Sequence, residues 1–204
     1  MSPRTSKQFD RIRQEKKELI METALELFAE NGYHATSISQ IAKKAGISKG
    51  LTYNYFESKK EILDKLITHG FDSIFESFDL NHDSVLTEEE FIHFIRENFR
   101  LLRENLKHWK LFFSLLLQPS VSDNFSKDYA EKGAPMFQML FSFLKSQGSI
   151  DPEGDLMVLS AMLEGAFLYL IVAPEVFPMK IMEEKVINSI SRLISTENNS
   201  TSKL

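Results

Sequence analysis

Four side chains in one short segment carry oxygen atoms at the spacing of ligands to a calcium ion. Counted from Asp79 as the first position, Asn81 is third, Asp83 is fifth and Glu90 is twelfth. Twelve-residue calcium loops take side-chain ligands from these positions, a backbone carbonyl from the seventh, and a direct or water-bridged contact from the ninth. The predicted ligands are therefore Asp79, Asn81, Asp83, Val85, Thr87 and Glu90.

The surrounding residues support two interpretations of this segment, and the sequence leaves both open. Phenylalanines flank the loop and Leu86 at its eighth position is apolar, as in the EF-hands that residues 75–91 resemble. Position six, however, is Ser84, where EF-hands place a glycine for the sharp turn. Thr87 and Glu90 also have the spacing of a helix capping box. Residues 79–90 form either a weak calcium site that braces two helices or a capped turn, and no other cofactor is expected.

A second group of residues has the pattern of a helix-turn-helix that binds nucleic acid. Ser37 and Gln40 are spaced as a capping box that opens a short helix. Gly46 ends this helix, since glycine tolerates a left-handed backbone, and Ser48 can cap the next one. The second helix projects small and polar groups, which would let it enter a major groove. From spacing alone, a helical hairpin that binds no nucleic acid is the alternative.

Residues 27–63 resemble the DNA-binding domain of TetR-family transcriptional regulators. The resemblance rests on LF…NGY at the end of the first helix, on TSISQIAKKAGIS, and on SKGLTYNYF followed by Lys59. It implies a homodimer that represses from a palindromic double-stranded DNA operator and is released by a small-molecule effector. Carried over to this chain, it assigns phosphate contacts to Thr36 and Ser37, groove-facing positions to Ser48, Lys49, Gly50 and Thr52, and contacts to the DNA backbone to Tyr53, Tyr55 and Lys59.

One position departs from the family pattern. Family members often have an apolar residue where this chain has Thr52, and Leu51 precedes it. Either the core accepts a threonine there, or Leu51 takes part of the packing.

Helical spacing of apolar residues continues along the rest of the chain, and no segment alternates like a β-strand. We therefore expect an all-α protein, with a three-helix DNA-binding domain followed by a helical domain for ligand binding and dimerisation. The expected parts are a flexible basic arm at 1–9, the helix-turn-helix domain at 10–57, the effector-binding and dimerisation domain at 58–195, and a disordered tail at 196–204.

The C-terminal part is rich in aromatic residues and methionine, which line apolar effector pockets in TetR-like proteins. Core packing is the alternative for each of them. Glu164 stands alone in an apolar segment, where it would anchor a ligand if buried or face water or an arginine if exposed. The two last helices are the expected dimer faces, because Gly165 and Ala166 allow close approach. The predicted pocket lining is Trp109, Phe112, Phe113, Leu116, Met136, Phe137, Leu140, Phe141, Met162 and Glu164.

Composition and charge restrict the class of protein further. Residues 1–60 hold 11 Lys and Arg against 7 Asp and Glu, whereas the remainder holds 13 against 22, so the N-terminal part suits a polyanion. The chain has no cysteine, glycine-rich phosphate loop or HExxH motif, so an enzyme is not expected. No apolar run reaches the ~18 residues of a membrane helix, and the first residues lack the apolar core of a signal peptide. We expect a cytoplasmic protein that does not enter a membrane.

Overall fold

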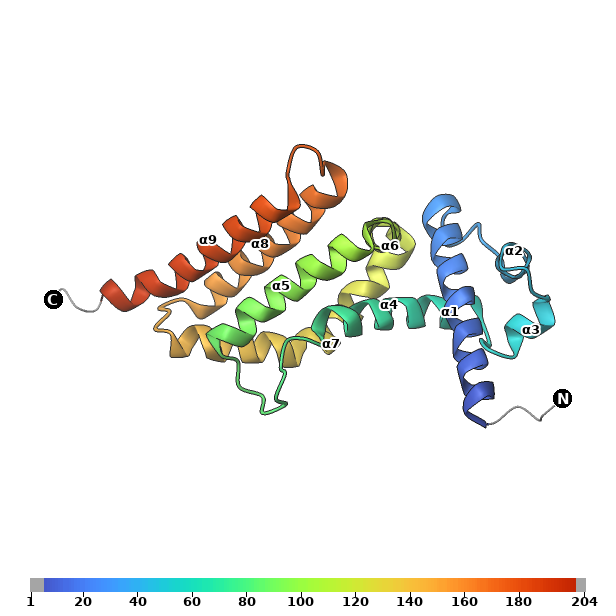
Figure 1. The fold of residues 1–204 in the computed structure, drawn as a ribbon, viewed down its shortest axis with the longest axis horizontal. Coiled ribbons are helices and arrows are strands. Elements are labelled where there is room, and N and C mark those ends of the chain that lie inside the picture. The colour runs from blue at the N-terminus through green and yellow to red at the C-terminus, as the bar shows by residue number, and fades with distance from the viewer. Residues whose placement is uncertain (1–5, 201–204) are drawn as a thin grey trace. The chain divides into compact units, whose positions relative to one another are not determined.

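The computed structural model describes the backbone of residues 6–200 and the side chains of residues 7–122, 130, 131 and 133–194. Within this part of the chain all regular elements are helices, as the apolar periodicity predicts (Figure 1). The chain divides into two compact units. The first unit extends to Asp72 and includes Leu111–Ser126, and the second unit comprises Ser73–Lys110 and the residues from Lys127 onward.

The first unit contains three N-terminal helices and parts of three others. Its complete helices are α1 (Ser6–Asn31), α2 (Ile38–Lys44) and α3 (Lys49–Tyr53), and it takes in most of α4 (Lys59–Phe75). The chain returns to it with the end of α6 (Leu106–Leu116) and the start of α7 (Pro119–Ser146). Fully buried aliphatic and aromatic side chains from successive turns of α1 form its core together with those of α2 and α4: Ile20, Ala24, Phe28, Ile41 and Ile62.

The second unit is built around α5 (Glu88–Glu104), α8 (Pro152–Val172) and α9 (Met179–Ser200). Thr87 caps α5 through the predicted capping box with Glu90, and Asp151 caps α8 just before Pro152. Helix α9 packs against both α5 and α8 (Figure 1). The buried stripe of α5 follows the predicted helical spacing: Phe91, Ile95, Phe99 and Leu102.

The structure corrects the predicted boundaries. Helix α1 begins at Ser6, so residues 6–9 are helical rather than part of a loose arm, and α9 continues to Ser200. The first unit also extends beyond residue 57 and regains residues 111–126. One reason is that the ring of Phe112 lies directly on the backbone of α4 at Gly70, where it leaves no room for a Cβ atom. Residues 1–5 and 201–204 lie outside the described part.

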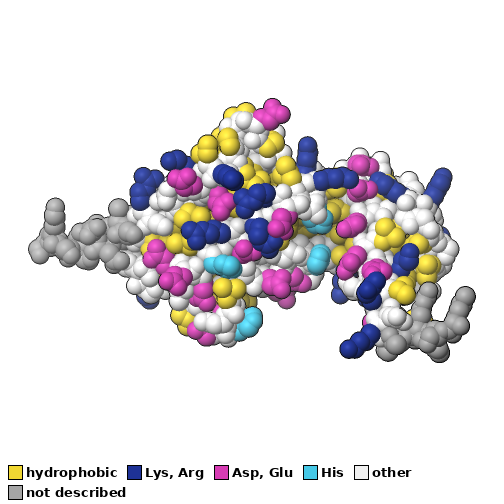
Figure 2. Space-filling model, in the orientation of Figure 1, with side chains coloured by type: hydrophobic (Ala, Val, Ile, Leu, Met, Phe, Trp, Pro, Cys, Tyr) yellow, Lys and Arg dark blue, Asp and Glu magenta, His cyan; other side chains and the backbone are white. Residues whose placement is uncertain are grey.

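Helix α8 carries apolar side chains on its exposed side as well as on its buried side. Leu159 and Leu170 are fully buried, whereas Met157 and Val172 are 72% and 70% exposed. By length and composition alone, α8 is apolar enough to cross a membrane. In Figure 2, acidic and basic side chains are interspersed over the visible face, and hydrophobic side chains reach the surface at the α8–α9 connection, where Val176 is also exposed. An apolar outer side of this kind suits a second packing partner.

Candidate functional site

The turn between α2 and α3 is fixed by local hydrogen bonds that the sequence predicts. The Ser37 hydroxyl accepts from the Gln40 N–H, and the Gln40 side chain accepts from the Ser37 N–H, so the predicted capping box is present. Gly46 has a φ of +67°, and Ser48 caps α3 by accepting from the Leu51 N–H. These contacts hold α3 at a defined angle to α2, the geometry that presents one helix to a groove.

Helix α3 presents an outward surface of small and polar groups. Ser48, Lys49 and Gly50 are exposed at its start, and Tyr53 is 47% exposed at its end. The Lys49 ammonium lies 5.9 Å from the centroid of the Tyr53 ring. Ser37 is also exposed and Tyr55 is half-buried. The start of α3 can therefore approach DNA closely, because the residues on either side of Lys49 are small.

Two of the predicted contact residues are buried, and the predicted role of their side chains is wrong. Thr36 is only 2% exposed, and its hydroxyl donates to the carbonyls of Leu27 (3.1 Å) and Gly32 (2.9 Å). Thr52 is fully buried, and its hydroxyl donates to the Ser48 carbonyl one turn earlier (3.3 Å). The core accepts a threonine at position 52 because this local bond satisfies the hydroxyl.

Lys59 occupies the first position of α4, where its ammonium group turns inward. It donates to the carbonyls of Tyr33 (2.7 Å), His34 (3.2 Å) and Thr36 (2.8 Å), and it lies 4.4 Å from the centroid of the Tyr33 ring. Burial lowers the pKa of this ammonium, whereas the three acceptors favour its charged form. Its acceptors all belong to residues 32–37, which we call the α1–α2 connection.

Gln118 holds the same connection and was not singled out by sequence reasoning. Its amide N–H donates to the Phe28 carbonyl (2.7 Å), and its amide oxygen accepts from the Tyr33 N–H (2.9 Å). The two partners lie 90 and 85 residues away along the chain. No motif or periodicity relates residues at such a separation, so the sequence offered no signal for this contact.

The residues that form this helix-turn-helix match a known protein family. Residues 20–66, which include α2, the turn and α3, match the family model described as bacterial regulatory proteins, tetR family. The match covers the helix-turn-helix and its flanking helices, so the similarity to this family is shown for residues 20–66.

The similarity to individual family members covers different shares of the chain. An uncharacterized HTH-type transcriptional regulator of Bacillus subtilis, YuxN, is 38% identical over 107 residues, which are 51% of this chain and 35% of the relative. The fatty acid metabolism regulator protein of the same organism is 34% identical over 84 residues, 41% of this chain and 43% of the relative. The chain thus spans less than half the length of these curated relatives. The solved structure of the fatty acid degradation regulator FadR from Bacillus halodurans shares the fold, with a TM-score of 0.65 and 20% identity over 88% of this chain and 94% of that chain.

The residues predicted to line an effector pocket are divided between the two units. Phe112, Phe113 and Leu116 belong to the first unit and the other seven to the second. Among the seven, Trp109 and Leu140 are buried, whereas Glu164 is exposed. The interpretation of Glu164 as a buried anchor for a ligand is therefore wrong. Half-buried aromatic and methionine side chains make up the rest: Met136, Phe137, Phe141 and Met162.

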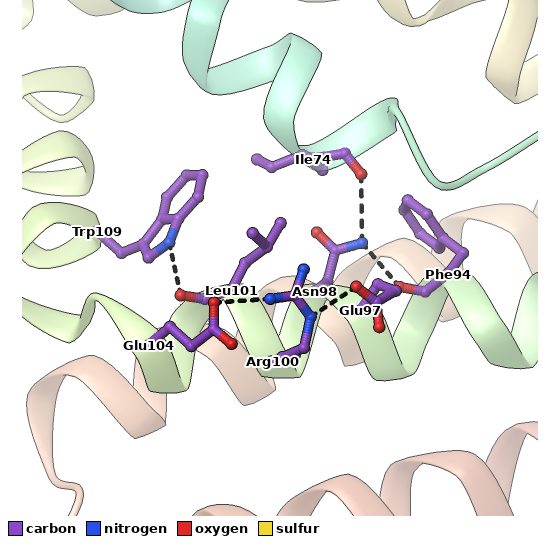
Figure 3. A network of polar contacts seen from close by, with 8 residues as sticks. All are labelled: Ile74, Phe94, Glu97, Asn98, Arg100, Leu101, Glu104 and Trp109. Atoms are coloured by element: carbon purple, nitrogen blue, oxygen red, sulfur yellow. Dashed lines mark hydrogen bonds and ion pairs between the residues drawn. The ribbon is translucent and has the colours of Figure 1, made fainter. Parts of the chain in front are cut away.

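Trp109 takes part in a polar network of the second unit (Figure 3). Its indole N–H donates to the Leu101 carbonyl of α5 (3.1 Å). On the same helix, the buried Asn98 donates to the carbonyls of Ile74 (3.3 Å) and Phe94 (2.9 Å), which ties α5 to the end of α4. The Trp109 ring thus has a structural role whether or not a ligand contacts it.

The α4–α5 loop, residues 76–87, is closed by its own side chains. The Asp79 carboxylate accepts from the Ser84 N–H (3.1 Å), Asn81 accepts from the Asp83 N–H (3.0 Å), and Asp83 accepts from the Val85 N–H (2.8 Å). Ser84 has a φ of 63°, so it adopts the left-handed conformation that the glycine of an EF-hand supplies. The second Asp79 oxygen, Oδ1, is buried without a hydrogen-bond partner among the described residues.

Glu90, the acid at the other end of the predicted calcium-binding segment, takes part in a helix cap. Glu90 accepts from the backbone N–H of Thr87 (3.0 Å) and from its hydroxyl (2.8 Å), so it completes the helix cap. Within the described residues, no three or more His, Cys, Asp or Glu side chains are grouped so that they could hold a metal ion. A calcium ion would therefore require Glu90 to leave its capping position.

A surface depression in the second unit was also absent from the sequence prediction. It has a volume of about 330 Å³ and lies along α5 and α9. Its charged lining differs from the apolar pocket that the sequence predicts, and comprises Arg96, Lys180, Glu183, Glu184, Ile187 and Asn188.

Proposed function

We propose that this chain is a ligand-responsive DNA-binding transcriptional regulator, and more specifically a repressor that leaves a palindromic operator when a small apolar effector binds. The observation that carries the proposal is the exposed start of α3, with Ser48, Lys49 and Gly50 projecting from a turn fixed by Gly46. Small residues allow close approach to base edges, and Lys49 supplies a positive charge for guanine or phosphate. We propose no catalytic role and expect the protein to act in the cytoplasm.

We propose that two copies bind together through α8 and α9. The exposed apolar side of α8 needs a covering surface, and a second copy of the same helix pair supplies one by two-fold symmetry. A single five-residue reading helix contacts too few bases for specificity, so a dimer would place two of them about one duplex turn, ~34–36 Å, or a multiple of it apart. The side chains that would be covered are Met157, Val158, Leu168, Tyr169 and Val172.

The test is selection of duplexes from a random-sequence pool, followed by gel shift and by light scattering of the free protein. We expect an inverted-repeat sequence, a dimer in solution, and weaker binding in Lys49→Ala without a change in the dimer. Enrichment of no sequence above the starting pool contradicts the proposal. A monomer that associates with lipid vesicles would instead assign the apolar side of α8 to a membrane surface.

The effector is proposed to be mainly apolar. Half-buried Met136, Phe137, Phe141 and Met162 favour an apolar ligand, and two relatives are named as regulators of fatty acid metabolism or degradation. Long-chain fatty acids are therefore the first probe. We expect them to release the selected duplex and to change the fluorescence of Trp109, the only tryptophan. Release without a fluorescence change would place the ligand away from Trp109.

A second candidate function is calcium binding by residues 79–90. The observation that favours it is the buried Asp79 oxygen without a partner among the described residues. In addition Ser84, the sixth residue of segment 79–90, already has the left-handed backbone of an EF-hand loop. In this proposal Asp79, Asn81, Asp83 and Glu90 give side-chain oxygens, Val85 a carbonyl, and Thr87 a direct or water-bridged contact.

Calorimetry tests the calcium proposal. We expect heat of binding with a Kd of ~10⁻⁵ to 10⁻³ M, as for weak sensor and extracellular sites, and its loss in Asp79→Ala and in Glu90→Ala. Magnesium at equal concentration is the control ion. If millimolar calcium gives neither heat nor a shift in Tm, the segment is only a capped turn.

A further inference from the structure

The inward direction of the Lys59 side chain conflicts with a role in binding DNA directly. A lysine ammonium has three N–H bonds and no acceptor. In this structure Lys59 directs them to three carbonyl oxygens, at 2.7, 3.2 and 2.8 Å. A phosphate oxygen would therefore have to replace one of these acceptors, which leaves a carbonyl of the connection without its partner.

The three acceptor carbonyls lie within four consecutive residues of one short segment. Tyr33, His34 and Thr36 follow Gly32, whose φ of +88° reverses the chain after α1. Their carbonyls converge on one point because the segment curls around the ammonium group. The Tyr33 ring lies on another side of it, at 4.4 Å, and adds a cation–π contact. Lys59 thus organises a loop that has no regular structure of its own.

The position of this loop connects Lys59 to the DNA-binding surface. The α1–α2 connection ends at Ser37, the residue that caps α2, and α2 leads through the turn to α3. Lys59 itself is the first residue of α4. Its three hydrogen bonds therefore fix the start of α4 to the entry of the helix-turn-helix.

We propose that Lys59 is a positioning residue, which holds the α1–α2 connection so that α2 and α3 are correctly placed for DNA, and that it does not contact the phosphate backbone. This inference rests on the proposed DNA binding and names the residue that orients the reading helix. Lys49, whose side chain is exposed at the start of α3, has the opposite role and serves as the matched comparison.

The first experiment compares Lys59→Met with Lys49→Met on the selected duplex over a series of salt concentrations. Lys49→Met should lower the slope of log K against log salt by about 0.9, the value for one phosphate contact, and leave Tm unchanged. Lys59→Met should leave that slope at the wild-type value. It should lower Tm by about 4 °C or more and weaken binding about tenfold, a loss typical of hydrogen bonds to a charged group. A lower slope in Lys59→Met, with or without a change in Tm, overturns the proposal.

A charge-conserving variant also distinguishes positioning of the α1–α2 connection from direct contact with phosphate. Lys59→Arg keeps the positive charge, but a planar guanidinium directs its N–H bonds in a flat fork and cannot match three converging carbonyls. We expect Lys59→Arg to have the reduced Tm and affinity of Lys59→Met. Wild-type affinity and Tm in Lys59→Arg would overturn the proposal, because a phosphate contact accepts either cation.

A measurement on the wild-type chain avoids any loss of folding in the variants. In ¹⁵N-labelled protein, the ammonium signal of Lys59 can be assigned by its absence from Lys59→Arg. We expect a signal that is protected from exchange in the free protein and keeps that protection when the duplex is added. An unprotected ammonium in the free protein overturns the proposal. If the protein binds no duplex, the proposed function fails, while this signal and the Tm values still decide whether Lys59 holds the connection.

Discussion

The α1–α2 connection and the α4–α5 loop are both short irregular segments, but they are stabilised in opposite ways. The first is held by residues from distant parts of the chain, Lys59 and Gln118, which lie 23 to 26 and 85 positions from the groups that they bind in it. The second is held by its own carboxylates and amide, over two to five positions. The conformation of the α1–α2 connection therefore depends on the folded unit, whereas the conformation of the α4–α5 loop is determined by bonds within the loop.

This difference relates to the proposed roles of the two segments. A connection that sets the placement of a reading helix must be rigid relative to the helices around it, and distant partners supply that rigidity. A loop that organises its own oxygens can present them outward. Asn81 and Asp83 are exposed in the α4–α5 loop, whereas Thr36 is buried in the connection.

The largest expected effect comes from removing the distant amide. Gln118→Leu eliminates two hydrogen bonds, so we expect the free energy of unfolding to fall by about 2 kcal/mol. Urea unfolding followed by circular dichroism measures it. Gln14→Leu is the control, since Gln14 makes an exposed bond to Glu18 within α1, a pair worth only ~0.2–0.5 kcal/mol. Equal losses in the two variants would break the comparison, because the connection would then need no distant support.

An intermediate loss of stability is expected from the buried threonines. Both lie in the first unit, so they compare a bond of the α1–α2 connection with a bond inside one helix. Thr36→Val removes a hydroxyl that joins the connection to the end of α1, and should cost about 1–2 kcal/mol. Thr52→Val removes only a bond to the previous turn of its own helix, at 3.3 Å, and should cost less than about 1 kcal/mol. The same urea measurement ranks them, and the reverse order would contradict the assigned importance of the connection.

The smallest effect has the opposite sign and tests the self-contained loop. Ser84 has a left-handed backbone that costs a non-glycine residue about 1–2 kcal/mol, of which the flexibility of glycine cancels a part. We expect Ser84→Gly to raise the free energy of unfolding by about 0.5 kcal/mol. Ser142→Gly, at an exposed position within α7, should lower it by about the same amount. A loss of stability in Ser84→Gly would mean that the serine side chain itself holds the loop.

Most of the first unit could be predicted because its signals are local. The Ser37–Gln40 capping box, the turn at Gly46 and the cap at Ser48 all involve residues three or four positions apart, and each is present as predicted. The all-α class followed from the apolar spacing, which the buried stripe of α5 reproduces. Local chemistry and periodicity are the two properties that a single sequence displays directly.

The errors arose where burial depends on distant parts of the fold. The sequence gives Thr52 the same outward pattern as its neighbours, but the packing of the first unit buries it completely. For Glu164 the apolar segment left burial and exposure both open, and the fold places it on the exposed side of α8. Lys59 is predicted to hold the DNA backbone, but its ammonium turns inward, and this direction depends on the path of a loop 23 residues earlier. None of these facts follows from spacing along the chain.

The bond between Gln118 and Tyr33 also bears on how the protein is made. The first unit is not contiguous, because it includes Leu111–Ser126. On the ribosome, helices α1 to α4 leave the exit tunnel before Phe112 and Gln118 do, so the nascent helix-turn-helix at first lacks two of its supports. The helix-turn-helix gains these supports only when more than half of the chain has left the exit tunnel. A protein truncated after α4 would remain in that unfinished state.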